Sequence, residues 1–136
     1  MRVAMIDSNT NTTSCPFCGD RLNRRVIAEH GTVIAIRDRY PVTEYHTLVI
    51  PKRHTTDFFT MTSQERRDAE ALILSLKNEI LKNDPSVTGF NMGVNCGESA
   101  GQTIMHAHIH LIPRQDGDTP NPRGGIRGVI PDKMAY

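Results

Sequence analysis

The stretch His106-Ala107-His108-Ile109-His110-Leu111-Ile112 holds half of the chain's six histidines, at alternating positions. Side chains alternate between the two faces of a β-strand, so a period of two places the three imidazoles on one face. The apolar residues between them then point to the other face, toward a core. Successive residues on one face lie about 6.6–6.8 Å apart, so each imidazole can do a different task on one ligand. We therefore predict a strand over residues 103–113 that carries the functional site.

The pattern by itself allows three interpretations of these histidines. They could be incidental residues of a polar face, ligands of one metal ion, or catalytic groups. Histidine is rarely clustered to this degree without a use, which disfavours the first interpretation. Imidazole has an ordinary pKa near ~6.5 and is a suitable nucleophile toward phosphorus at neutral pH. The spacing supports a shared face, but it does not show which histidine would attack.

The rest of the sequence predicts several strands and one long helix. Thr62 can cap a helix, with Glu65 three residues later completing a capping box. The apolar residues that follow recur mainly on one face until Asn83-Asp84-Pro85 ends the helix. Further strands are predicted at 25–29, 32–37, 47–51 and 87–94. This order of strands, helix and strands favours a segregated α+β domain over alternating βαβ units.

Length and composition limit the other possibilities. The chain has 136 residues, the size of one domain, and a net charge of +1, which gives no support to nucleic-acid binding. No apolar run is long enough to cross a membrane, and residues 1–14 lack the pattern of a signal peptide. We expect a cytoplasmic protein with a flexible segment over 1–14, a domain over 15–115 and an extended tail over 116–136.

Two of the three cysteines form the motif Cys15-Pro16-Phe17-Cys18. In a reducing compartment such a pair is more typical of metal or redox chemistry than of a disulfide framework. The surrounding sequence lacks the helix start expected of a thioredoxin-like redox motif. We therefore favour zinc over an empty thiol pair, and a tetrahedral zinc site needs two further ligands.

Two blocks of the sequence resemble the histidine triad family. The run GQTIMHAHIHLIP at 101–113 is similar to the family signature, and HTLVIPKRH at 46–54 is similar to its second block. With the helix between them, the resemblance covers about residues 14–115. It implies a homodimer of α+β subunits, each an antiparallel sheet with one long helix packed on it. It also implies hydrolysis or transfer of nucleoside monophosphates through a nucleotidyl-histidine intermediate.

The resemblance implies a separate role for each histidine. The middle histidine of the triad, His108 here, would attack the α-phosphorus. His110 would contact the phosphate and help to balance its charge, and His46 would lie nearby in a hydrogen-bonded relay. Some bacterial members, and the related galactose-1-phosphate uridylyltransferases, combine CxxC with two histidines. The implied zinc ligands are Cys15, Cys18, His54 and His106, and four protein ligands leave no position for water, so the role would be structural.

The resemblance also implies a nucleotide site. Asp38 lies eight residues before His46, where family members place an acidic or amide group on the ribose hydroxyls, although a turn residue is an equal interpretation. The expected base slot involves Ile36 and Val49, which would serve equally well as core. The family's phosphate-binding loop, in which glycine allows close approach and polar groups donate hydrogen bonds, corresponds to Asn95, Gly101, Gln102 and Thr103.

The tail is longer than in small phosphoramidase-like members and resembles the bacterial branch described as diadenosine polyphosphate hydrolases. Arg123 or Arg127 could reach a distal phosphate, although a solvent-exposed tail is the slightly favoured interpretation. The leading hypothesis is a hydrolase of dinucleoside polyphosphates that releases a nucleoside monophosphate. The alternatives are a nucleoside phosphoramidate hydrolase and a non-catalytic nucleotide sensor.

Overall fold

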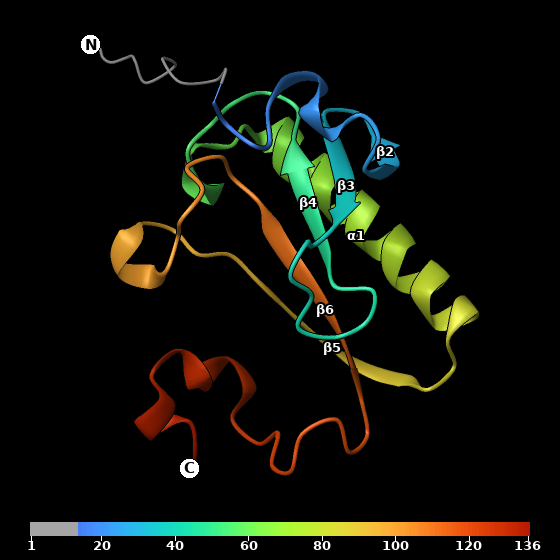
Figure 1. Cartoon of the computed structure of the whole chain (residues 1–136), viewed down its shortest axis with the longest axis vertical. Helices are drawn as coiled ribbons and strands as arrows, with labels where there is room; N and C mark the ends of the chain where they lie inside the picture. Colours follow the sequence, from blue (N-terminus) through green and yellow to red (C-terminus); the bar gives the residue numbers. More distant parts are fainter. Residues whose placement is uncertain (1–13) are drawn as a thin grey trace.

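The computed structural model describes residues 14–136, which form a five-stranded sheet with one long helix across one face (Figure 1). The order in the sheet is β2-β3-β4-β6-β5, and every neighbouring pair is antiparallel. This confirms the predicted α+β fold. Apart from Ser14, the segment predicted to be flexible lies outside the described residues. The elements are β2 (Val26–His30), β3 (Val33–Arg37), β4 (Thr47–Pro51), α1 (Ser63–Asn83), β5 (Val87–Gly93) and β6 (Ile109–Gln115).

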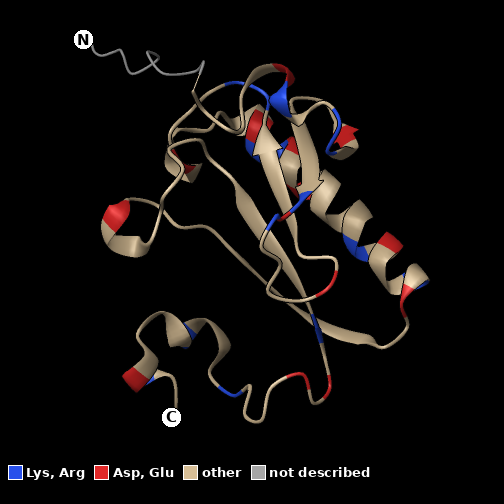
Figure 2. Ribbon diagram, viewed as in Figure 1, with Lys and Arg blue, Asp and Glu red and all other residues tan. Residues whose placement is uncertain are grey.

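Helix α1 begins at the predicted capping box. The Thr62 hydroxyl accepts a hydrogen bond from the Glu65 N–H (3.0 Å), and the Glu65 carboxylate accepts one from the Thr62 N–H (2.8 Å). Charged residues gather on its exposed side (Figure 2). Among the described residues, no helix is both long and apolar enough to cross a bilayer. The buried stripe is the predicted one and includes Ala69, Leu72, Ile73, Leu76 and Ile80.

The two faces of the sheet are covered by different partners. Helix α1 covers one face, where its apolar stripe packs against Val49, Ile109 and other inward residues of the strands. On the opposite face, Leu48 and Ile50 belong to a second cluster that includes Phe17 of the N-terminal segment. Strand β4 is therefore buried on both faces, which explains why its sequence, TLVIP, is apolar without alternation.

Strand β6 begins later than the sequence predicted. The prediction covered residues 103–113, whereas the strand spans Ile109–Gln115. Pro51, at the end of the neighbouring β4, has no N–H to donate to a backbone hydrogen bond with β6. Its carbonyl accepts a hydrogen bond from His106 Nε2 (2.8 Å). The preceding histidines therefore lie outside the ladder, although Ala107 is still buried in the core beneath α1.

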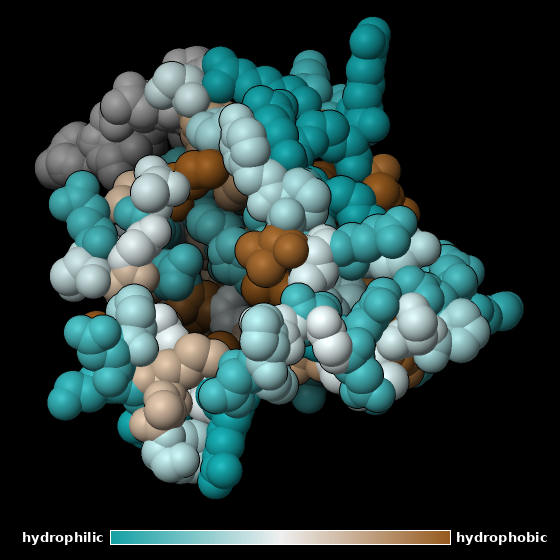
Figure 3. All heavy atoms as spheres, turned by 60° about the horizontal axis from the view of Figure 1, so that its bottom comes forward, coloured by the Kyte–Doolittle hydropathy of each residue, from teal (hydrophilic) through white to brown (hydrophobic). Residues whose placement is uncertain are grey.

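The C-terminal segment 116–136 is irregular rather than extended. It contains two short 3-10 helices, η4 (Gly125–Val129) and η5 (Pro131–Lys133), and lies at one end of the molecule (Figure 1). A cavity of about 500 Å³ separates it from Ile112 and neighbouring residues. Figure 3 brings this end forward and shows a hollowed surface with apolar patches beside the hollow.

Candidate active site and metal centre

His108 lies just before β6 and borders a cavity of about 820 Å³. Its Nδ1 lies 2.8 Å from the carbonyl oxygen of His106. Because a carbonyl only accepts hydrogen bonds, Nδ1 carries the ring proton and Nε2 keeps its lone pair. The Phe17 ring packs edge-on against the imidazole, with ring centroids 5.2 Å apart. In the neutral form of this half-buried histidine, the ring lone pair is therefore on Nε2.

A second pair of histidines is ordered by the loop before β4. His46 Nδ1 accepts from the Val42 backbone N–H (3.0 Å), so the proton of the neutral His46 ring is on Nε2. This Nε2 lies 2.9 Å from His110 Nδ1 and 3.4 Å from a carboxylate oxygen of Asp38. Donation from His46 to His110 Nδ1 leaves the His110 proton on Nε2. His110 therefore offers a hydrogen-bond donor rather than a lone pair.

Burial keeps this pair neutral at pH 7. The pKa of His110 falls to about 4, mainly through burial and further through repulsion by the positive charges that His108 and His46 can carry. Burial also lowers the pKa of His46, and the Asp38 carboxylate partly opposes that shift. The relay therefore consists of hydrogen bonds between neutral rings, with a nearby carboxylate that can stabilise a transferred proton.

The cavity brings together most of the residues expected in the nucleotide site. At the end nearer β3 it is lined by Asp38, and at the end nearer the loop between β5 and β6 by Asn95, Gly101 and Thr103. The structure does not bring the Gln102 side chain to the cavity. That side chain is buried, accepts from the Gly97 N–H (2.8 Å) and donates to two loop carbonyls, so it holds the loop together.

The apolar lining differs from the expected base slot. Ile36 and Val49 are fully buried and do not line the cavity. The apolar lining comes instead from Phe17, Leu48 and neighbouring residues. Leu48 pairs with His110 across the sheet, so it shares the face of the histidines. The register of β4 against β6 could have identified Leu48, whereas no sequence signal indicated Phe17 beyond its place inside the CxxC motif.

The predicted metal ligands converge beside the active site, at the junction of the N-terminal segment and the sheet. His106 Nε2 donates to Pro51, which leaves the Nδ1 lone pair directed at the cluster. This Nδ1 lies 3.4 and 3.3 Å from the sulfurs of Cys15 and Cys18, and 3.2 Å from His54 Nδ1. Ordinary zinc–sulfur and zinc–nitrogen bond lengths separate tetrahedral ligands by about 3.3–3.8 Å. The donor set and its spacing therefore suit one tetrahedral ion.

The electrostatic environment of the cluster does not resemble that of a redox motif. Burial, followed by hydrogen bonding and repulsion from Cys15, raises the pKa of the Cys18 thiol to about 12 within the protein alone. Redox-active CxxC cysteines have lowered pKa values instead. Burial also lowers the pKa of His106 to about 4, which keeps this ligand neutral. A bound cation would supply the charge that turns both thiols into thiolates.

Comparison with known proteins identifies the family. A model of the HIT domain matches residues 21–117. The chain belongs to the histidine triad (HIT) family. An uncharacterized HIT-like protein of Mycoplasma genitalium is 35% identical over 116 residues, which cover 82% of this chain and 79% of that protein. An AP-4-A phosphorylase of Mycobacterium tuberculosis is 35% identical over 95 residues, which cover 68% of this chain and 48% of that enzyme.

A solved structure adds a metal to the comparison. A zinc-bound histidine triad family protein from Mycobacterium smegmatis superimposes with a TM-score of 0.64 at 30% identity, and the match covers 81% of each chain. The HIT domain places the present chain among nucleotide-processing proteins, and the Cys15, Cys18, His54 and His106 cluster can hold a metal ion.

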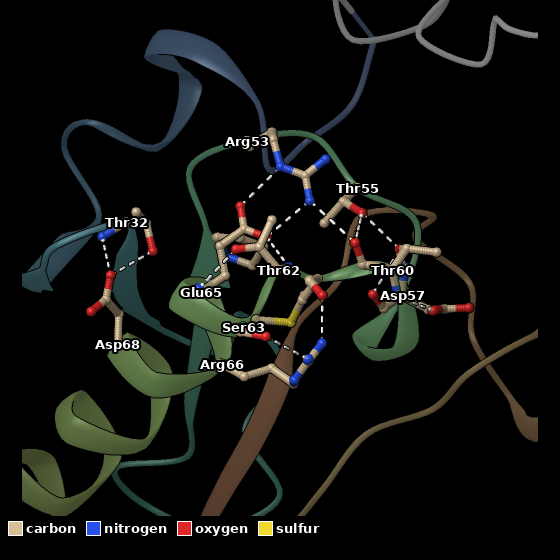
Figure 4. A network of polar contacts seen from close by, with 12 residues as sticks. Thr32, Arg53, Thr55, Asp57, Thr60, Thr62, Ser63, Glu65, Arg66 and Asp68 are labelled. Atoms are coloured by element: carbon tan, nitrogen blue, oxygen red, sulfur yellow. Dashed lines mark hydrogen bonds and ion pairs between the residues drawn. The ribbon is translucent and has the colours of Figure 1, made fainter.

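In this HIT protein, the loop that carries His54 is fixed to the start of α1 (Figure 4). The Arg53 guanidinium makes two hydrogen bonds with the Glu65 carboxylate, at 2.9 and 3.0 Å, and one with the Thr60 carbonyl (3.2 Å). Glu65 is also the capping-box residue that binds the Thr62 N–H. One buried carboxylate therefore both caps the helix and holds the residue next to the predicted metal ligand His54.

The tail arginines lie away from the cavity in the single chain. The Arg123 and Arg127 guanidiniums lie 5.4 and 4.9 Å from the centre of the Tyr136 ring, and neither lines the active-site cavity. The segment is instead attached to the sheet by the ion pair between Arg114 and Asp118 (2.6 Å).

Proposed function

We propose that this protein is a nucleotide hydrolase that attacks the α-phosphorus of dinucleoside polyphosphates and releases a nucleoside monophosphate. The tautomer of His108 is the observation that carries the proposal. A backbone carbonyl binds its Nδ1 proton, so Nε2 is a nucleophile beside the cavity. Asp38 and Gly101 both line this cavity, and we assign Asp38 to the ribose and the loop with Gly101 to the phosphates.

In the first step, His108 Nε2 forms a bond to the α-phosphorus while the bond from phosphorus to the leaving-group oxygen breaks. The bonding electron pair departs with the leaving group, and the imidazole becomes a cation that the His106 carbonyl stabilises at Nδ1. The His110 Nε2 proton is available to a non-bridging oxygen. In the second step, a water oxygen bonds to phosphorus and releases a proton to bulk solvent, the N–P bond breaks, and the electron pair returns to Nε2.

We further propose that Cys15, Cys18, His54 and His106 hold a structural zinc ion. When bound, zinc supplies a fixed cross-link and no open position for chemistry. His106 then serves two functions, because its ring is a ligand and its carbonyl holds the proton of His108. The cross-link would therefore hold the nucleophile in place as well as the N-terminal segment.

The nucleophile is tested with His108→Ala and, as a matched control, His30→Ala, which alters an exposed histidine at the end of β2. We expect His108→Ala to lower kcat/KM by about 10³-fold or more while the fold and the zinc content survive. Denaturing the wild type at alkaline pH during turnover of labelled substrate should trap a nucleotide on the protein, because the bond between phosphorus and histidine is stable in alkali and labile in acid. Full turnover by His108→Ala would contradict the proposal.

The leaving group is tested by comparing substrates. We expect diadenosine or diguanosine tetraphosphate to be cleaved faster than adenosine phosphoramidate, and the reverse order would favour P–N cleavage. One relative is named a phosphorylase, so the same assay should compare water with inorganic phosphate as the acceptor. Nucleotide binding without turnover on any of these substrates would favour the sensor.

A further inference from the structure

We propose that the nucleoside end of the cavity selects bases with hydrogen-bond acceptors on their edge, guanine in particular, through Arg25 and Arg39. This inference rests on the proposed nucleotide-binding function and assigns it a base preference. Both guanidiniums line the active-site cavity, together with Arg21. The basic character of this end is local, because the chain as a whole has a net charge of only +1.

The order of the strands places these arginines beyond the ribose. His110 lies on β6, and Asp38 directly follows β3, which is two strands away. Arg25 directly precedes β2, one strand further along. Strands lie about 4.7–4.9 Å apart, so three spacings separate the phosphate side from Arg25 by about 14 Å. A nucleotide with its phosphorus at His108 and its ribose at Asp38 therefore extends its base toward Arg25 and Arg39.

The two arginines differ in how they are held. Arg25 donates to the Arg37 carbonyl at the end of β3 (2.9 Å), which fixes its guanidinium at the cavity and leaves other N–H groups of the fork for a ligand. Arg39 is exposed, and within residues 14–136 it makes no hydrogen bond or ion pair. It directly follows Asp38, so it lies next to the proposed ribose contact.

The polar groups at this end suit the edge of a purine ring. Phe17 and Leu48 line the same cavity beside His108 and His110, and their small exposed fractions, 7% and 4%, form part of its apolar wall. A guanidinium offers only donors, so it matches guanine, which presents O6 and N7 as acceptors on one edge. Adenine presents an amino donor in place of O6, and this amino group would face the N–H donors of the arginine. Within residues 14–136, Asp38 is the only carboxylate that lines the cavity, and it is directed toward His46 and the Tyr40 N–H.

The alternative occupant of these arginines is a distal phosphate of a polyphosphate chain. The two possibilities differ in what they predict, because a phosphate contact is independent of the base. A base contact changes the ratio of affinities for guanine and adenine nucleotides that carry the same phosphate. Nucleoside monophosphates therefore isolate the base contact, since they have no distal phosphate.

The test is isothermal titration of the intact, zinc-loaded protein with GMP, IMP and AMP. IMP keeps O6 and N7 but lacks the 2-amino group of guanine, so it reports on the proposed edge alone. We expect GMP and IMP to bind about tenfold more tightly than AMP, the discrimination of one good arginine–guanine contact. Arg39→Gln and Arg25→Gln should bring the three dissociation constants together by weakening GMP and IMP. Arg24→Gln, an exposed arginine that does not line the cavity, is the matched control and should leave the preference intact.

The outcomes separate this inference from the proposed function. Binding of AMP as tightly as GMP would overturn the base preference while leaving nucleotide binding in place. Equal weakening of all three nucleotides in the arginine variants would overturn it as well. Unchanged binding of all three in these variants would also overturn it and leave the arginines to a distal phosphate that monophosphates lack. If no nucleotide binds to the wild type, the proposed function itself fails, and the base preference fails with it.

Discussion

At the scale of single residues, the three histidines of the triad differ through the partner of one ring nitrogen. His106 donates from Nε2 to Pro51, so its Nδ1 lone pair faces the cysteines and His54. His108 donates from Nδ1 to the His106 carbonyl, so in the neutral ring the lone pair is on Nε2. His110 accepts at Nδ1 from His46 and keeps an Nε2 proton to donate. Identical side chains thus differ in which ring nitrogen carries the proton because each has a different hydrogen-bond partner, which is the basis of the three roles that we propose.

The lowered pKa of His110 predicts a loss of stability in acid. An unfolded histidine takes up a proton below its ordinary pKa of 6.5, whereas folded His110 does so only near pH 4. Between these values the unfolded state binds more protons, so the free energy of unfolding falls as the pH falls. The contribution of His110 between pH 7.5 and pH 5 is at most about 2 kcal/mol.

Urea unfolding of the wild type and His110→Asn at pH 7.5 and pH 5 measures this contribution. We expect the variant to lose less stability than the wild type over this interval. His30→Asn, at an exposed position, should behave as the wild type does. An equal loss in the wild type and His110→Asn would show that His110 is not held neutral.

At the scale of elements, the start of α1 and the loop before it act as one unit. Glu65 is nearly buried and serves both the Thr62 cap and the Arg53 guanidinium, and Arg53 directly precedes His54 (Figure 4). The capping box was readable from sequence because its spacing is local. The ion pair between Arg53 and Glu65 was not, since it depends on how the loop folds back onto the helix.

This arrangement predicts that Glu65→Gln lowers the affinity for zinc while the capping box at the start of α1 remains. Glutamine can still complete a capping box, but it removes the charge that holds Arg53. We expect about a tenfold loss of zinc affinity in competition with a chelator, as is typical when groups that orient a metal ligand are altered. Asp118→Asn, which breaks the distant ion pair with Arg114, is the control. Unchanged zinc affinity in Glu65→Gln would disprove the coupling.

At the scale of the whole molecule, the predicted metal cluster connects three segments that lie far apart in the chain. Cys15 and Cys18 come from the N-terminal segment, His54 from the loop after β4, and His106 from the approach to β6. The segment also supplies Phe17, which packs against His108. Loss of the metal should therefore loosen both the second core cluster and the wall of the active site.

We predict about one zinc per chain in the purified protein, and its loss in the double variant Cys15→Ser/Cys18→Ser. Zinc removal should lower Tm and reduce nucleotide turnover together, because the same cross-link holds both. The zinc content is measured by metal analysis. The effects on Tm and turnover are measured with and without a chelator and after zinc is added back. A metal-free wild type with free thiols and unchanged activity would contradict the prediction.

The homodimer also stays a prediction, and sedimentation can test it.

The sequence predicted several features correctly because they depend on local periodicity. A capping box and an apolar stripe define α1, and a run without alternation defines β4. The period of two in the histidine motif also predicted that Ile109 and Leu111 belong to the core. It did not predict where β6 begins, since this depends on a missing N–H in the neighbouring strand.

The sequence by itself predicted which residues would carry the chemistry: the alternating histidines, the CxxC pair and the acidic residue before His46. Only the tertiary structure decided which ring nitrogen of each histidine is free. It also brought Phe17 and Leu48, rather than Ile36 and Val49, to the cavity. The physical reason is that periodicity places a side chain on a face, whereas its hydrogen-bond partner and its neighbours come from strand register and from segments far away in the chain.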